Sequence, residues 1–420
     1  MFRMKTAHGH VLGGGLAALG LLAAACSAPA PEEAPASTAT AFEGARLIVG
    51  DGQTIENATF VVDDTRFVAV GATGAVEVPE GAARVDLTGM TVMPAIVDAH
   101  VHLSTTREAL IEDLEMRAYF GVGAALSLGS DGEDAPLEVR DELVPAGARY
   151  KSAGRGITSP EPGRSEVPHW VTTEDDARQA VRDEAARDVD MLKIWVDDRN
   201  GQYERLSSEL YGAVIDEAHQ TGLRVAAHIF RLEDAKGLLE AEVDAFAHGV
   251  RDMDVDDEFV AMVQERPNVV LIPNMPGRGV PTDLDWLSGA LPVDDEEFAE
   301  LEAANVERPE AQEAFGIQAR NLARLSEAGM TIAIGTDGNT PWAPHVEMED
   351  MVAAGMSPAD VLVAATHNAA AFAGFDDMGT VAVGKSADFV VLEANPLDDI
   401  TNTRRIAEVY LRGAAVNRIR

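Results

Sequence analysis

The chain has 420 residues, of which 46% are hydrophobic and 25% are charged, and its formal net charge is −38. This length can bury one large core with a smaller domain beside it. Because 71 acidic residues face only 33 basic ones, the chain would repel phosphate, so the composition excludes a nucleic-acid partner and favours a solvated surface in a salty or extracellular medium.

The first 26 residues have the pattern of an export signal. Arg3 and Lys5 precede an uncharged run of apolar residues and glycines at 11–25, which is short for a membrane span. Cys26 is the only cysteine and follows Leu-Ala-Ala-Ala, which resembles a bacterial lipoprotein signal whose cysteine becomes the lipidated N-terminus. An ordinary cleaved signal is the alternative. We expect an exported lipoprotein, anchored to a bacterial membrane through Cys26 and facing the periplasm or cell exterior.

The segments that follow differ in composition and in the pattern of their apolar residues. Residues 27–41 are rich in Pro, Ala, Ser and Thr without an apolar period, so we expect a disordered tether. Residues 42–94 contain short β-rich runs separated by turn residues, as in an antiparallel sheet, and the same texture returns at 376–420. We predict that these two segments build one small β-sandwich domain.

Residues 95–375 alternate apolar β runs with amphipathic helical stretches, which indicates an α/β fold with parallel strands. Eight candidate strands occur over about 280 residues, which fits a TIM (β/α)8 barrel with insertions. The longest insertion, residues 273–315, follows the seventh strand. We expect it to act as a lid or specificity loop.

Two histidines end the first of these strands, in the stretch VMPAIVDAHVHL. Because alternate residues of a strand share a face, Asp98, His100 and His102 point the same way, toward the barrel interior. They lie at the C-terminal end of the strand, where barrel enzymes place their active sites. Two neutral imidazoles can chelate zinc or a similar ion, although two packed polar residues explain the pair equally well.

Four more polar residues interrupt apolar strands at the same relative depth: Lys193, His228, His248 and Asp337. Each has a structural explanation of its own, since lysine can snorkel, histidine can bond a carbonyl and aspartate can cap a helix. Four coincidences at C-terminal strand ends are much less expected than one shared site.

The set His100-x-His102, Lys193, His228, His248 and Asp337 resembles the amidohydrolase superfamily in its two-metal form with a carboxylated lysine. The resemblance is greatest to the branch that holds imidazolonepropionase and prolidase-like enzymes. It is carried further by DMLKIWVDD, GLRVAAHIF, IGTDG and GTVAVGKSADFVVLEANPL, and covers nearly everything after Phe42. Ala95, where glycine is usual, and His367 depart from the pattern.

The resemblance implies a metal-dependent hydrolytic site. A carbamate on Lys193, derived from carbon dioxide, would bridge two divalent ions, with zinc favoured. A hydroxide between the ions would attack the substrate carbonyl, and Asp337 would carry its proton to the leaving nitrogen. Asp337 and His248 are the predicted catalytic residues. The first ion would be bound by His100, His102 and Asp337, and the second by His228 and His248.

The predicted activity is hydrolysis of an amide bond in a small molecule, with a dipeptide or N-acyl amino acid favoured. One alternative is a hydrolase of a cyclic amide, such as a lactam or imidazolone, or of a lactone. Another is a lipid-anchored protein that binds metal or solute without catalysis. Four residues near strand ends are predicted substrate contacts: His169, Arg231, His345 and Tyr150.

Overall fold

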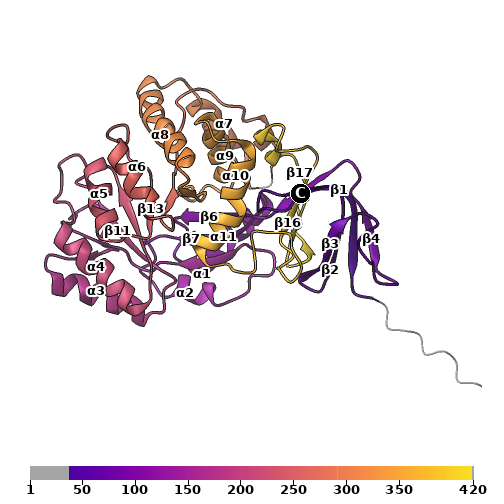
Figure 1. Ribbon diagram of the computed structural model, residues 1–420, viewed down its shortest axis with the longest axis horizontal. Coiled ribbons are helices and arrows are strands. Elements are labelled where there is room, and N and C mark those ends of the chain that lie inside the picture. The colour runs from indigo at the N-terminus through magenta and orange to yellow at the C-terminus, as the bar shows by residue number, and fades with distance from the viewer. Residues whose placement is uncertain (1–36, 291, 419–420) are drawn as a thin grey trace, which may run out of the picture. The chain divides into compact units, whose positions relative to one another are not determined.

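The computed structural model describes residues 37–290 and 292–418 (Figure 1). The predicted signal, Cys26 and most of the predicted tether lie outside these residues. None of the helices within the described ranges combines the length and apolar character needed to cross a membrane.

The two ends of the described chain meet in one sheet. The two parts contribute the strands β1 (Thr40–Ile48), β2 (Thr54–Asp63), β3 (Arg66–Ala72), β4 (Ala83–Asp86) and β5 (Thr91–Pro94), and then β16 (Phe389–Leu392), β17 (Ile406–Leu411) and β18 (Ala414–Ala415). Strands β5 and β16 pair antiparallel, with Val390 opposite Met93. Aromatic rings fill the core of this sheet, where Phe42 and Phe60 stack at 5.0 Å and Phe389 packs edge-on at 5.2 Å from each.

This sheet differs from the predicted pair of sandwiched sheets because its eight strands form one connected sheet. Strand β1 joins its parts, since it pairs with β2, with β4 and with β5. Two register shifts, at Glu43/Ala45 and Ala45/Leu47, interrupt its pairing with β2. Irregularities of this kind bend a strand, so one strand can serve several neighbours without a second sheet.

The eight strands predicted between the two ends are all present and lie in two parallel sheets. One sheet contains β6 (Ile96–Val101), β7 (Val122–Ser127) and β8 (Arg149–Ser152). The other, in spatial order, contains β10 (His169–Trp170), β9 (Ile157–Thr158), β11 (Leu192–Val196), β12 (Val225–Ile229), β13 (Ala245–Ala247), β14 (Val270–Ile272) and β15 (Thr331–Ile332). The two-residue strands β9 and β10 were not predicted.

Backbone hydrogen bonds connect the two parallel sheets at two places. At one place the N–H of Ala99 in β6 donates to Ile334, just after β15, at 3.0 Å. At the other, the N–H of Asp190, just before β11, donates to Ser152 of β8 at 2.9 Å. The arrangement is a TIM-barrel-like α/β fold, although the strands of the described chain are not assigned to one closed sheet.

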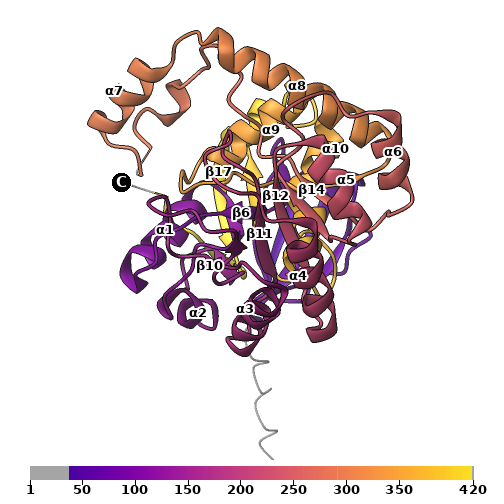
Figure 2. The same ribbon diagram turned by 90° about the vertical axis from the view of Figure 1, so that its left-hand side faces the viewer.

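Helices alternate with these strands and surround them (Figure 2). They are α1 (Arg107–Tyr119), α2 (Ala135–Arg140), α3 (Glu174–Ala186), α4 (Ser208–Thr221), α5 (Leu232–Glu240), α6 (Asp257–Gln264), α7 (Asp295–Ala304), α8 (Pro309–Glu327), α9 (Ala343–Ala353), α10 (Pro358–Val363) and α11 (Ala369–Ala373). Helix α3 shows why they form. The hydroxyl of Thr173 caps its first turn by accepting from the N–H of Asp176, and Ala177, Ala180 and Val181 form its buried face.

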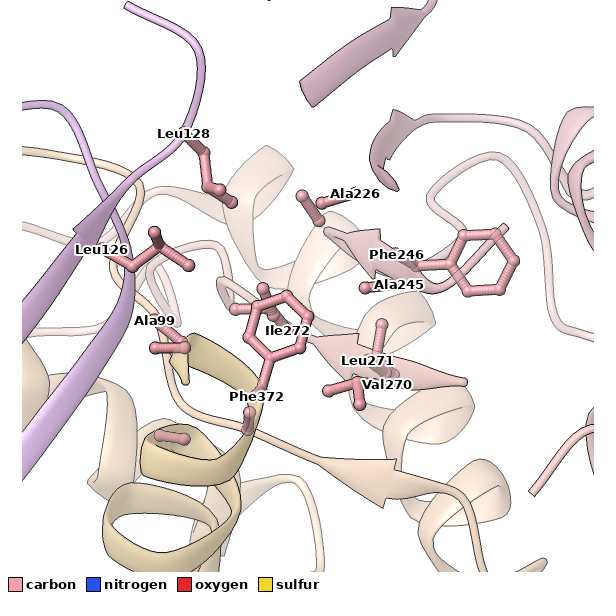
Figure 3. Close-up of a cluster of buried hydrophobic side chains, with 14 of the residues drawn as sticks. Ala99, Leu126, Leu128, Ala226, Ala245, Phe246, Val270, Leu271, Ile272 and Phe372 are labelled. Carbon is pink, nitrogen blue, oxygen red and sulfur yellow. The ribbon is translucent and has the colours of Figure 1, made fainter. Parts of the chain in front are cut away.

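The main core lies between the strands and the helices. Figure 3 shows residues from β6, β7, β12, β13 and β14, together with Phe372 of α11, converging on one cluster. Small residues such as Ala99, Ala226 and Ala245 are fully buried there beside Phe246 and Ile272. This packing fixes the strands, and therefore the direction in which the residues at their C-terminal ends point.

Candidate metal centre

Five of the six polar residues predicted to share a site lie at the C-terminal ends of the parallel strands, and Lys193 reaches the same cluster from the second position of β11. His100, Lys193 and His228 lie within β6, β11 and β12. His102 and His248 follow the ends of β6 and β13, and Asp337 follows β15. Because parallel strands place their C-terminal ends at one edge, residues distant in sequence meet there.

Asp337 is at the centre of this cluster. Its Oδ1 atom lies 3.1 Å from Nε2 of His100 and 3.0 Å from Nε2 of His102. Its Oδ2 atom lies 3.3 Å from Nε2 of His248. One carboxylate therefore faces three imidazole nitrogens from two segments of the chain, the end of β6 and the residue after β13.

The remaining two residues complete the cluster, His228 beside His248 and Lys193 beside His100. The ring of His228 lies 4.6 Å from that of His248, centroid to centroid. The Nζ atom of Lys193 lies 3.5 Å from Nε2 of His100. Lys193 and His100 are fully buried, and His248 and His228 nearly so.

Burial sets the protonation of these groups. It lowers the pKa of Lys193 to about 7, so much of the amine is neutral near neutral pH. It also lowers the pKa of His100 to about 4 and that of His228 to about 3. The imidazoles of His100 and His228 are therefore neutral at pH 7, the form that binds metal.

Side chains outside the cluster fix two of the rings. The Nδ1 atom of His100 lies 3.0 Å from Oδ1 of Asn274, and Nδ1 of His102 lies 2.9 Å from Oγ of Ser130. Both bonds turn the Nε2 atoms toward Asp337. Asn274 and Ser130 were not predicted from the sequence. The only feature of the sequence that could have indicated them is their position, shortly after the ends of β14 and β7 respectively.

The orientation of His100 fits a bound cation. An amide oxygen only accepts, so Nδ1 of His100 donates to Asn274, and the neutral ring then presents a lone pair at Nε2. That lone pair faces the carboxylate of Asp337 at 3.1 Å. Two acceptors facing one another repel unless a cation lies between them. Ligand atoms of His100, His102 and Asp337 all lie within 4.8 Å of one another, a suitable spacing for one ion.

Three residues at this centre have an unusual backbone conformation. His248 has a φ of 83°, Asp337 a φ of 55° and Asn274 a φ of 43°, all in the left-handed region that side-chain-bearing residues avoid. Such conformations cost about 1–3 kcal/mol each and persist where the surroundings impose them. Their clustering here supports a functional role for this edge of the strands.

A cavity of about 650 Å³ opens onto the cluster. It is lined by His102, Ser130, Glu161, Arg164, Ser165, Val167, Pro168, Trp195, Arg199, His228, Arg251 and Asp337. A second cavity of about 670 Å³ lies beside Arg149 and Lys151 of β8, and its lining includes none of the six clustered residues. Of these two cavities, the first is therefore the one that adjoins the cluster.

The four predicted substrate contacts do not belong to the lining of that cavity, as far as the described residues show. Tyr150 is buried and its hydroxyl donates to Asp131 at 2.7 Å. His345 is buried and bonds the carbonyl oxygen of Phe120 at 2.9 Å. The other two have partners outside the cavity: His169 forms a hydrogen bond with Glu184 at 2.7 Å, and Arg231 forms an ion pair with Asp198 at 2.6 Å.

The predicted lid also lies elsewhere. No described residue of 273–315 lines the cavity. Leu287 and Val293 of this insertion pack instead with Phe120 and Trp342. Figure 2 shows α7 set apart from β11 and β12. Two residues that were not predicted, Arg199 and Arg251, line the cavity together with the predicted His102, His228 and Asp337.

Comparisons with known proteins agree with this geometry. The profile described as the Amidohydrolase family matches residues 168–416. Imidazolonepropionase from Deinococcus radiodurans is 26% identical over 402 residues, which cover 87% of this chain and 94% of that protein. The solved structure of a candidate prolidase from Bifidobacterium longum is 30% identical, with a TM-score of 0.75, and the match covers 91% of this chain and 95% of that one.

A more distant relative, ochratoxinase from Aspergillus niger, is 22% identical over 413 residues, covering 84% of this chain and 81% of that protein. Fold and site together define a hydrolase with a site suited to divalent metal ions. The chain belongs to the amidohydrolase family and acts on carbon–nitrogen bonds.

Proposed function

We propose that this protein hydrolyses the amide bond of a dipeptide or an N-acyl amino acid with the help of two divalent metal ions, zinc being favoured. The observation that carries the proposal is the position of Asp337, whose carboxylate faces three histidines. The similarity to the candidate prolidase from B. longum, over nearly the whole of both chains, supports the substrate class.

Six residues would hold the ions: His100, His102, Lys193, His228, His248 and Asp337. The neutral amine of Lys193 can add carbon dioxide to form a carbamate, which supplies the anionic oxygens that two cations need. When bound, the ions make water a nucleophile at neutral pH and polarise the carbonyl under attack. We also propose that the two parallel sheets together form one (β/α)8 barrel.

The chain's own residues would position the reaction and move the proton. Asp337 lies at the mouth of the cavity, where its carboxylate would accept the proton of the attacking water and deliver it to the leaving nitrogen. His248, 3.3 Å from Oδ2 of Asp337, would hold that carboxylate in place. Trp195 would form an apolar wall for the substrate.

A substrate panel tests this proposal. Zinc-loaded protein should cleave linear dipeptides or N-acyl amino acids faster than lactams, imidazolones or lactones. A second candidate activity, hydrolysis of a cyclic amide, is favoured by the similarity to imidazolonepropionase. Turnover of cyclic amides alone would replace the first proposal with the second, and no turnover of any member would contradict both.

We also propose that the protein is exported and held at a bacterial membrane by lipid on Cys26. The basic and apolar pattern of the first 26 residues supports this. In a bacterial host, the wild-type chain should fractionate with membranes, and Cys26→Ser should release it or leave its signal uncleaved. Equal fractionation of the two chains, with the signal cleaved from both, would contradict the anchor.

A further inference from the structure

The charge of the substrate cavity is opposite to that of the chain. Three arginines line the cavity, Arg164, Arg199 and Arg251, against two carboxylates, Glu161 and Asp337. The chain as a whole carries a net charge of −38. The three guanidinium groups outnumber the two carboxylates, so these lining side chains carry a net positive charge. A cationic cavity in so acidic a protein indicates an anionic ligand.

One of the two carboxylates is already used within the protein. Glu161 is buried and forms ion pairs with Arg164 at 2.5 Å and with Nε of Arg199 at 3.1 Å. The Nη1 atom of Arg199 bonds Asp197 at 2.8 Å. These contacts satisfy most of the nitrogens of Arg199. They leave Glu161 with no free charge for Arg251.

Two guanidinium nitrogens at the cavity remain without a partner. Nε of Arg251 and Nη2 of Arg199 are both buried and have no hydrogen-bond acceptor among the described residues. A buried donor without a partner costs about 1–3 kcal/mol, and more when it is charged. A ligand whose oxygen atoms accept hydrogen bonds from these two nitrogens would remove this free-energy cost.

Both arginines lie next to the metal-binding histidines. Arg251 follows His248 by three residues, and its backbone N–H donates to the carbonyl of Phe230, just beyond β12, at 2.9 Å. Nη1 of Arg199 lies 3.2 Å from Nε2 of His228. An anion bound by the two free nitrogens would therefore lie beside the reacting bond.

We propose that Arg251, together with the free Nη2 of Arg199, binds a carboxylate of the substrate and so makes a free carboxylate close to the scissile bond a requirement. A planar guanidinium matches the two oxygens of a carboxylate. This inference rests on the proposed function, because it takes the bound carboxylate to be part of the substrate. Binding of an anion at the two arginines does not itself depend on turnover.

Calorimetric titration of the zinc-loaded protein tests the subsite with ligands that cannot be cleaved. One series pairs L-amino acids with their carboxamides and represents a carboxylate on the amine part of the substrate. The other pairs succinate with succinamide and represents a carboxylate on the acyl part. At least one carboxylate should bind about tenfold or more tightly than its amide, the size of a charged hydrogen bond. The series that shows this preference identifies the carboxylate-bearing part.

Variants assign the preference to the arginine. Arg251→Met should abolish it, and Arg251→Lys, which keeps the charge but not the paired N–H groups, should retain part of it. Arg320→Met is the matched control, because Arg320 pairs with Asp254 on the surface and should leave the preference unchanged.

Two results would overturn the subsite: no carboxylate binds more tightly than its amide in the wild type, or the preference survives in Arg251→Met. If Arg251→Met does not fold, a full wild-type preference in Arg251→Lys would overturn the subsite in its place. Failure of the proposed function is distinguishable, because it would show as selective carboxylate binding without turnover of any substrate in the panel.

Discussion

The two ring nitrogens of His100 face two different side chains, with Nδ1 3.0 Å from Oδ1 of Asn274 and Nε2 3.1 Å from Oδ1 of Asp337. The first contact fixes the tautomer that exposes a lone pair toward the second. Asn274 therefore prepares His100 to bind a cation, although it is not itself a proposed ligand.

Replacing Asn274 with alanine should weaken metal binding. Loss of such an orienting partner typically costs 10- to 100-fold in metal affinity, and we expect about that range for Asn274→Ala. Competition with a zinc chelator measures the affinity. Asn321→Ala is the control, because Asn321 is an equally buried asparagine that bonds Val255, Val250 and Met253. Equal zinc affinity of wild type and Asn274→Ala would refute the orienting role.

A methyl group at Gly156 should disturb the wall of the cavity. A Cβ atom there would lie 2.0 Å from Cζ3 of Trp195, whose ring lines the cavity. Gly156→Ala should therefore lower the free energy of unfolding by about 1–3 kcal/mol, the usual cost of overpacking, and should reduce kcat/KM. Urea denaturation and steady-state kinetics measure the two effects.

The control for Gly156→Ala is the same substitution at Gly212. Gly212 lies within α4 and has nothing within 4 Å of an added Cβ, so Gly212→Ala should stabilise the protein by about 0.5–1 kcal/mol. Similar stability of Gly156→Ala and wild type would mean that the ring of Trp195 moves freely, contrary to its assigned place.

The buried imidazole of His345 should make stability depend on pH. Burial lowers its pKa in the folded protein to about 4, whereas the unfolded chain keeps the ordinary value of about 6.5. Between these values the unfolded chain binds the proton and the folded protein does not. The contribution of His345 is therefore fully present above pH 6.5 and is lost as the pH falls toward 4.

His345→Gln should remove the part of the pH dependence of the free energy of unfolding that His345 causes. Metal-free wild type should lose up to about 3 kcal/mol more than the variant between pH 7 and pH 4, from the size of the pKa shift. Urea denaturation at both pH values measures the difference. Parallel losses in the two proteins would show that His345 does not titrate with folding.

The six clustered residues could be predicted from the sequence because only strand periodicity and a rule about parallel strands are needed to find them. Each residue interrupts an apolar run, and parallel strands bring their C-terminal ends to one edge whatever the loops between them do. The eight strands themselves were predicted for the same reason, since apolar runs alternate with amphipathic helices.

The residues around the cluster could not be predicted from strand periodicity and strand direction. Tyr150 is in a predicted strand, but it packs with Leu110 and Leu114 of α1 on the face that meets the helices, and this face depends on register. Conversely, Arg251 and Asn274 lie in loops whose paths are set by contacts with distant segments. Loop residues follow neither a helical nor a strand periodicity, so the sequence pattern does not predict where their side chains lie.

The single connected sheet at the chain ends was also not predictable in detail. Short β runs predict strands, but they do not say whether the strands form one sheet or two. That depends on how β1 divides its pairing among β2, β4 and β5.

The most direct test of the account is the metal content of the purified protein, measured together with turnover for wild type, Lys193→Ala and Lys151→Ala. The last variant removes a lysine on β8 that bonds the carbonyl of Gly374 and lies outside the cluster. We predict about two divalent ions per chain for wild type and Lys151→Ala, and loss of an ion and of turnover for Lys193→Ala. Full turnover by metal-free wild type, or two ions retained by Lys193→Ala, would contradict the account.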